Sequence, residues 1–264
     1  GYDTSLFTGR DLAPGWPGGY VPSVVSNVRS LARIGDYSSA PEVNAAKSFI
    51  AHLRRAGVKT SYSGKQSANG EVLARTAGHS VQQAVKVMLR VSENNVAEVL
   101  FRQVAIAQGK PANWAGARAA AVEVLHALGV DTAGAALNDG SGLSRSDRLT
   151  PTTLVHTLTL STQKKNTKLR QIYFGHSLPT AGETGTLDAK YGRYSSGPSS
   201  CARGHVFAKT GTLYDTIGLS GITNDADGGV KVFSILVNDR PQRFADLTTR
   251  RAVDVLAATI NGCY

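Results

Sequence analysis

The chain has 264 residues and an apolar content of 41%, which fit one large or two small globular domains and exclude a disordered chain. The formal net charge of +10 makes nucleic acid a partner to consider, but the basic residues are scattered, with no long run and no interleaved aromatic residues, so we expect a solvated surface and no nucleic-acid binding. No apolar stretch approaches the roughly eighteen residues of a membrane-spanning helix.

The first third of the chain predicts a surface connection, a helix and short strands. Residues 1–35 are rich in Gly and Pro and run into an apolar stretch at 24–28 that predicts a strand. Helical spacing of apolar residues then continues from a cap at Ser38-Ser39 to Gly57. We expect two more strands, over 58–63 and 71–76, separated by a polar turn.

Two helices are predicted to meet at Ser92-Glu93-Asn94. Ser80 and Gln83 form a capping box, and helical spacing follows until Ser92 interrupts it. The spacing resumes from Asn94 to Gly109. Ser and Asn are favoured helix caps, so these residues alone indicate a cap. A functional alternative is that both polar side chains point outward from the joint.

The middle of the chain alternates helices with loops. Helical patterns cover 113–129 and 151–160, the second begun by a cap and a proline, and a further helix is expected over 168–175. Residues 138–145 and 188–204 have the Gly, Ser and Asn content of loops.

A strand with an unusual tetrapeptide, Lys209-Thr210-Gly211-Thr212, follows these loops. Because strand side chains alternate, Lys209 and Gly211 share one face and both threonines share the other. Gly inside a strand indicates that a ligand or another backbone approaches closely. The alternative is a short strand with a surface lysine, since a K-T-G tripeptide alone is a weak signal.

The end of the chain predicts a meander and a helix. Turn signals at 214–215 and 224–229 separate the Lys209 strand from strands over 217–223 and 230–237, which together form a three-stranded antiparallel sheet. The last helix is expected over 243–261. The chain has two cysteines, Cys201 and Cys263. They permit one disulfide or two buried thiols, and too few other metal ligands accompany them to suggest a zinc site.

Four of these stretches, taken in order, resemble penicillin-binding proteins of the D-alanyl-D-alanine carboxypeptidase and endopeptidase type. They are Ser92-Glu93-Asn94, the loop from Leu137 to Arg145, the stretch from Leu178 to Leu187, and Lys209-Thr210-Gly211. The resemblance runs from Tyr2 to the last helix. Such serine enzymes carry the motifs S-x-x-K, S-x-N and K-T-G.

The first motif is missing from its expected place. No S-x-x-K lies ahead of Ser92, and the one that occurs, Ser161 to Lys164, lies between the other two motifs in a polar tail after a helix. We therefore expect the nucleophile to belong to a missing N-terminal portion that carries S-x-x-K. A folded sample should contain that portion, because its helix would pack under the Lys209 strand.

The resemblance implies an α/β fold of the penicillin-binding, transpeptidase-like kind, incomplete at the N-terminus. An antiparallel sheet is flanked by helices and faces a mostly helical lobe. Residues 1–35 would return from an inserted domain and 36–264 would form the catalytic-domain portion. Within it, the helical lobe covers about 36–187 and the sheet with the C-terminal helix about 188–264.

The resemblance also implies roles for the motif residues. Ser92 would relay protons, and Lys209 would supply positive charge beside it. Asn94 would hold the substrate backbone. Gly211 would permit another group to approach the strand closely. The hydroxyls of Thr210 and Thr212 would bind the carboxylate of the terminal D-alanine.

The parent protein would trim peptidoglycan stem peptides that end in D-Ala-D-Ala through an acyl-enzyme, and it would bind β-lactams. The resemblance implies that the protein needs no metal or organic cofactor. It also implies that the protein is exported, to the periplasm or the cell-wall side of the membrane. In such an oxidising compartment, Cys201 and Cys263 would form a disulfide. The alternative is a non-catalytic module that binds muropeptides or a partner and has lost the nucleophile.

Overall fold

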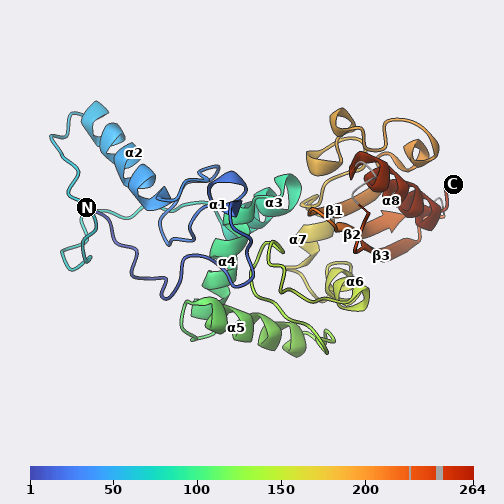
Figure 1. Cartoon of the computed structure of the whole chain (residues 1–264), viewed down its shortest axis with the longest axis horizontal. Helices are drawn as coiled ribbons and strands as arrows, with labels where there is room; N and C mark the ends of the chain where they lie inside the picture. Colours follow the sequence, from blue (N-terminus) through green and yellow to red (C-terminus); the bar gives the residue numbers. More distant parts are fainter. Residues whose placement is uncertain (226, 242–245) are drawn as a thin grey trace. The chain divides into compact units, whose positions relative to one another are not determined.

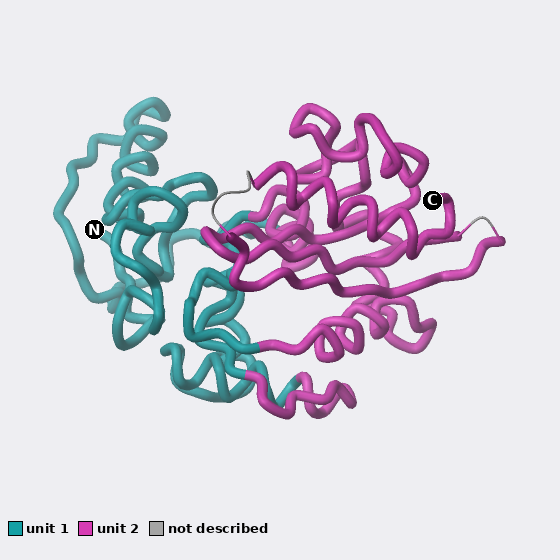
Figure 2. The backbone as a smooth tube through the Cα atoms, turned by 45° about the vertical axis from the view of Figure 1, so that its right-hand side comes forward, with its two compact units in different colours: residues 1–79, 93–124, 136–148 teal, residues 80–92, 125–135, 149–264 magenta. Residues whose placement is uncertain are grey.

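A computed structural model describes residues 1–225, 227–241 and 246–264. The chain divides into two compact units, which Figure 2 colours separately. Unit 1 contains residues 1–79, 93–124 and 136–148, and unit 2 contains residues 80–92, 125–135 and 149–264. The division crosses the S-x-N motif between residues 92 and 93, so Ser92 belongs to unit 2 and Asn94 to unit 1.

Unit 1 is helical, with four helices shown in Figure 1: α1 (Tyr20–Ser23), α2 (Pro41–Arg55), α4 (Asn94–Ala107) and most of α5 (Trp114–Ala127). Its core packs the apolar stripes of α4 and α5 against the N-terminal segment. The fully or nearly buried members of this core are Ala13, Val28, Phe101, Ala105, Trp114 and Ala117.

A buried arginine connects these pieces. Arg102 of α4 donates hydrogen bonds to the carbonyls of Thr8, Arg10 and Ala112, at 2.7 to 2.8 Å. Its guanidinium also lies 3.9 Å from the ring centroid of Trp114. Carbonyl oxygens and an aromatic face thus replace water around the charge, which makes its burial tolerable.

The three strands predicted in the first third of the chain are wrong. Around 24–28 the backbone forms no strand, and Val25 and Val28 are buried within unit 1. Their apolar pattern reflects burial against helices, where Asn95 Oδ1 accepts from Ser26 N–H at 2.7 Å. Over 58–63 and 71–76 the residues are mostly exposed, and no strand among the described residues pairs with them. Strand propensity without a partner does not produce a sheet.

Unit 2 holds the sheet. Strands β1 (Val206–Thr212), β2 (Ile217–Asn224) and β3 (Val230–Val237) form an antiparallel meander in the order β1-β2-β3, which confirms the predicted topology. Its helices are α3 (Val81–Val91), α6 (Pro151–Leu160), α7 (Arg170–Tyr173) and α8 (Asp246–Asn261), with short 3₁₀ turns η1 (Gly185–Leu187), η2 (Ala189–Tyr191) and η3 (Pro198–Ala202).

The register gives the sheet two covered faces, so the fold is α/β with helices flanking an antiparallel sheet. Ala208, Gly221 and Phe233 lie opposite one another on the first face, and this face packs against α8. Phe207 and Ile222 lie on the second face, which packs against apolar residues of α3, α6 and α7. Lys209 shares this second face with Phe207 because side chains alternate.

Local signals place the helices of unit 2 well. Ser80 and Gln83 make the expected capping box at the start of α3, and Thr150 Oγ1 accepts from Thr153 N–H at the start of α6. The helix predicted over 168–175 is only the short α7. For the last helix, residues 243–245 of the prediction lie outside the described residues. None of the described helices is long and apolar enough to cross a bilayer.

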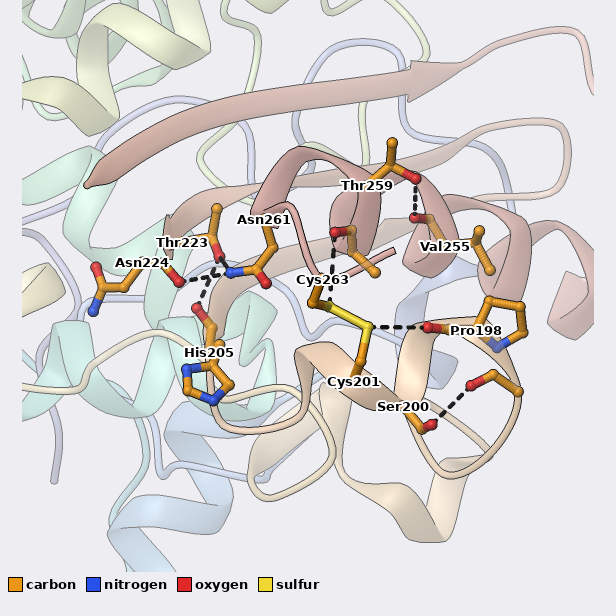
Figure 3. The surroundings of a disulfide bond; sticks show 12 residues. Pro198, Ser200, Cys201, His205, Thr223, Asn224, Val255, Thr259, Asn261 and Cys263 are labelled. Carbon is orange, nitrogen blue, oxygen red and sulfur yellow. Dashed lines mark hydrogen bonds between the residues drawn. A yellow bond between two sulfur atoms is a disulfide. The ribbon is translucent and has the colours of Figure 1, made fainter. Parts of the chain in front are cut away.

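A disulfide joins two segments that cover the sheet. Cys201 of η3 and Cys263, which follows α8, are bonded with their Cα atoms 5.9 Å apart (Figure 3). Beside it, Asn261 Nδ2 donates to Thr223 Oγ1 at 2.8 Å and to the Asn224 carbonyl at 2.6 Å. The end of α8 is therefore fixed both to η3 and to β2.

Candidate active site

Helix α3 carries Ser92 at its C-terminal cap. The backbone there is left-handed, with φ 59° and ψ 51°, and Ser92 N–H donates to the Met88 carbonyl. A residue with a Cβ adopts this conformation at a cost, and such positions cluster at functional sites. The left-handed backbone at Ser92 ends α3.

Ser92 and Lys209 meet, although 117 residues separate them in sequence. Lys209 Nζ donates to Ser92 Oγ at 2.8 Å and to the carbonyl of Thr210 at 2.7 Å. The structure therefore brings together the two residues that the S-x-N and K-T-G motifs predicted to cooperate.

The environment of Lys209 changes its acid–base behaviour. Burial lowers the pKa of Lys209 to about 8, because a low-dielectric site disfavours the ammonium form. The ammonium donates to Ser92 Oγ, so the serine hydroxyl keeps its own proton for a third group. With a pKa close to neutral pH, the pair can both give and accept a proton.

Gly211 leaves bare backbone on the face that Lys209 occupies. It pairs with Gly218 on β2, and a Cβ added at Gly211 would lie 3.7 Å from Gly218 Cα, an ordinary contact. Packing among the described residues thus does not require glycine at this position. Gly211 is exposed, so its backbone is open to close approach by another group.

The outer edge of β1 is covered at one end and open at the other. Ala208 N–H donates to the Pro179 carbonyl, and Ala181 N–H donates to the Val206 carbonyl. Because hydrogen-bonding groups alternate between the sides of a strand, the N–H groups of Thr210 and Thr212 point to the same outer side. Among the described residues no backbone acceptor is bound to either group. This open edge can accept one more extended peptide strand.

The two predicted hydroxyls differ in their surroundings. Thr212 is exposed at the end of β1. Thr210 is half-buried, and its Oγ1 donates to Thr186 Oγ1 of η1 at 2.8 Å. Thr186 lies in the predicted stretch from Leu178 to Leu187, but no role was predicted for it, because nothing local indicates which strand residue it contacts.

Asn94 has a different partner within unit 1. Its Nδ2 donates to the carbonyl of Val24 at 2.9 Å, at the start of α4. The neighbouring Glu93 is buried and accepts from Tyr37 Oη at 2.6 Å. The described contacts therefore hold the N-terminus of α4 in unit 1.

The isolated S-x-x-K does not have the properties of a nucleophile. Ser161 is fully buried, and its Oγ donates to the Leu158 carbonyl at 2.6 Å at the C-terminus of α6. This is the contact of a helix-terminal serine.

The loop from Leu137 to Arg145 is held by buried carboxylates that the sequence analysis missed. Glu98 of α4 is fully buried and accepts from Gly140 N–H at 2.8 Å and from Ser141 N–H at 2.9 Å. Burial and nearby Asp139 raise the pKa of Glu98 to about 8. The sequence did contain a signal for this buried charge. Glu98 and Arg102 are four residues apart on the apolar face of α4.

Known proteins resemble the chain over most of its length. The model of the D-Ala-D-Ala carboxypeptidase 3 (S13) family matches residues 18–260. Carboxypeptidase DacB of Mycolicibacterium smegmatis is 32% identical over 272 residues, covering 99% of this chain and 57% of that protein. A D-alanyl-D-alanine carboxypeptidase of Actinomadura is 33% identical over 199 residues, covering 74% of this chain and 35% of that protein.

Solved structures agree on the fold. Penicillin-binding protein 4 of Haemophilus influenzae superimposes with a TM-score of 0.75 at 21% identity, covering 99% of this chain and 74% of that one. The same protein with a bound β-lactam gives 0.66 at 27% identity, covering 83% of this chain and 50% of that one. The chain spans little more than half the length of its mycobacterial relative. From the match over residues 18–260, the chain belongs to the D-Ala-D-Ala carboxypeptidase 3 (S13) family.

Proposed function

We propose that this chain is part of a serine-type D-alanyl-D-alanine carboxypeptidase or endopeptidase that trims peptidoglycan stem peptides through an acyl-enzyme. The hydrogen bond between Lys209 Nζ and Ser92 Oγ carries the proposal, because it would allow a proton relay through a lysine whose pKa is lowered to about 8. The acylating serine and its lysine would come from an S-x-x-K helix outside this chain. The parent protein would be exported and act on the cell-wall side of the membrane.

The open edge of β1 fits the substrate. A stem peptide would pair with the outward N–H groups of Thr210 and Thr212 as an added strand. The hydroxyls of these threonines would bind the carboxylate of the terminal D-alanine, and the Thr212 N–H would donate to the developing oxyanion. Gly211 would allow the reacting groups to come close to the strand. Asn94 would hold the substrate backbone.

Labelling with a fluorescent penicillin tests this function in the native protein that carries the chain. We expect a covalent adduct that intact-mass and peptide analysis place on the serine of an S-x-x-K motif. Lys209→Ala should slow acylation by about 100-fold or more, because the relay loses its charge. Lys231→Ala on β3 is the matched control and should acylate at the wild-type rate.

Two outcomes would contradict the proposal. A native protein that no β-lactam acylates would support a binding module without a nucleophile. A folded Lys209→Ala variant that is acylated at the wild-type rate would remove Lys209 from the chemistry. The family match does not favour the binding module.

A further inference from the structure

The segment from Pro179 to Leu187 is fixed along the outer edge of β1. Pro179 and Ala181 hydrogen-bond the strand backbone at Ala208 and Val206. At the far end, Leu187 is fully buried in the core beneath the sheet. Thr186 therefore stands on a segment that is held at both ends.

The fit of this segment to α3 is equally close. Gly185 has a left-handed backbone with φ +58°, and an added Cβ would lie 2.1 Å from the Arg90 carbonyl in the last turn of α3. Thr186 thus lies between the helix that carries Ser92 and the strand that carries Lys209. Its hydroxyl contacts Thr210 Oγ1 at 2.8 Å, at the point where the covered part of the β1 edge ends.

A hydroxyl group has one proton to donate. In the structure, Thr210 donates that proton to Thr186 Oγ1, so Thr210 cannot at the same time donate to an anion. If Thr186 turns and donates to Thr210 Oγ1, Thr210 becomes free to donate outward. The resulting chain runs from Thr186 to Thr210 to the ligand, and each bond polarises the next.

We propose that Thr186 is a positioning residue for carboxylate recognition at the open edge of β1. Its hydroxyl supports Thr210 from behind and turns it into a donor when a peptide carboxylate arrives. The inference rests on the proposed function, and it adds a residue outside the three motifs. A substrate whose terminal carboxylate is replaced by a neutral amide needs this donor less, because the hydrogen bond to an anion is the stronger one.

The test uses the native protein that carries the chain, with diacetyl-L-Lys-D-Ala-D-Ala and its C-terminal amide as substrates. Thr186→Val keeps the shape and removes the hydroxyl. We expect it to lower the ratio of kcat/KM for the acid over that for the amide by about 3- to 10-fold, the effect of one hydrogen bond. Thr186→Ser should restore the wild-type ratio. Thr259→Val, on the exposed side of α8, is the matched control and should leave the ratio unchanged.

A merely structural role would lower kcat/KM for both substrates alike, and that result would overturn the inference. Thr186→Ala removes the hydroxyl without packing a methyl group against the strand, so it decides the question if the valine variant does not fold. In a Thr210→Val background, Thr186→Val should have no further effect on the ratio. A wild-type protein that does not hydrolyse the free acid would contradict the proposed function itself, whatever the variants do.

Discussion

At the scale of single residues, the titration of Lys209 decides what the Ser92 contact can do. Its Nζ has two acceptors in the structure, Ser92 Oγ and the Thr210 carbonyl, which favour the charged form. Burial opposes them and leaves the pKa lowered to about 8. Desolvation therefore outweighs the two hydrogen bonds.

We expect NMR titration of lysine labelled with ¹³C at Cε to give Lys209 a pKa of about 8. Ser92→Ala should lower the pKa further, because the ammonium loses one acceptor while it remains buried. The Lys209→Met spectrum assigns the resonance. A pKa near the ordinary value of about 10.4 would show that water reaches the ammonium and that Lys209 exchanges protons at neutral pH no more readily than an exposed lysine.

The carboxyl groups around the 137–145 loop give unit 1 a pH-dependent stability. Burial and the charge of Asp139 raise the pKa of Glu98 to about 8 and that of Asp147 to about 7. The folded state thus binds these protons more tightly than the unfolded chain does. Their stabilising contribution is complete at low pH and is lost as the pH rises through the folded-state values.

We therefore expect the free energy of unfolding, measured in urea, to fall between about pH 5 and pH 8. Glu98→Gln should flatten this fall, since the amide does not titrate. The variant should also be less stable at every pH, because its NH₂ group faces a backbone N–H donor. Asp147→Asn is the parallel variant. Stability that rises over the same interval would mean that both carboxylates are ionised in the folded protein.

At the scale of elements, the relative placement of α3 and η1 depends on one glycine. Gly185 combines a left-handed backbone with a potential clash against the Arg90 carbonyl. The backbone sets the position of the added Cβ and the carbonyl is itself backbone, so no side-chain rotation relieves the clash. The last turn of α3, and with it Ser92, has to move if this position gains a side chain.

Gly185→Ala should lower the free energy of unfolding by clearly more than about 1 kcal/mol. Gly134→Ala is the matched control, because Gly134 also has a left-handed backbone, φ +73°, and nothing lies within 4 Å of an added Cβ. The difference between the two variants in urea unfolding measures the clash. Equal losses would show that α3 yields to η1 without cost.

At the scale of the whole molecule, the Cys201–Cys263 disulfide closes a loop with a sequence separation of 62 residues. That loop contains the entire meander and α8. Constraining so long a segment reduces the entropy of the unfolded chain by an amount worth about 4 kcal/mol in the chain-entropy model. The bond thus acts on the unit that carries the candidate site.

Replacing both cysteines by serine should lower the free energy of unfolding by up to about 4 kcal/mol, measured in urea. The wild-type protein unfolded in the presence of a reductant is the control and should show the same loss. If neither change affects stability, the entropy of the unfolded chain does not set the contribution of this bond. Free-thiol counting before unfolding checks that the bond is formed.

The sequence by itself determined the features whose signals are local. The capping box at Ser80, the turns of the meander and the alternation along β1 each depend on residues a few positions apart, so the strand with Lys209 and the helix before Ser92 were predicted correctly. The order of the motifs also indicated the family, because each motif is a short segment with a fixed chemistry.

Only the tertiary structure decided which distant residues meet. The apolar residues at 24–28 and 58–63 fit a strand locally, but within the part of the chain that the structure describes no strand pairs with them. The burial of Glu98, the lowered pKa of Lys209 and the contact of Thr186 with Thr210 depend on partners brought from elsewhere in the chain. Desolvation and hydrogen bonding act through space, so a sequence pattern read along the chain cannot supply their partners.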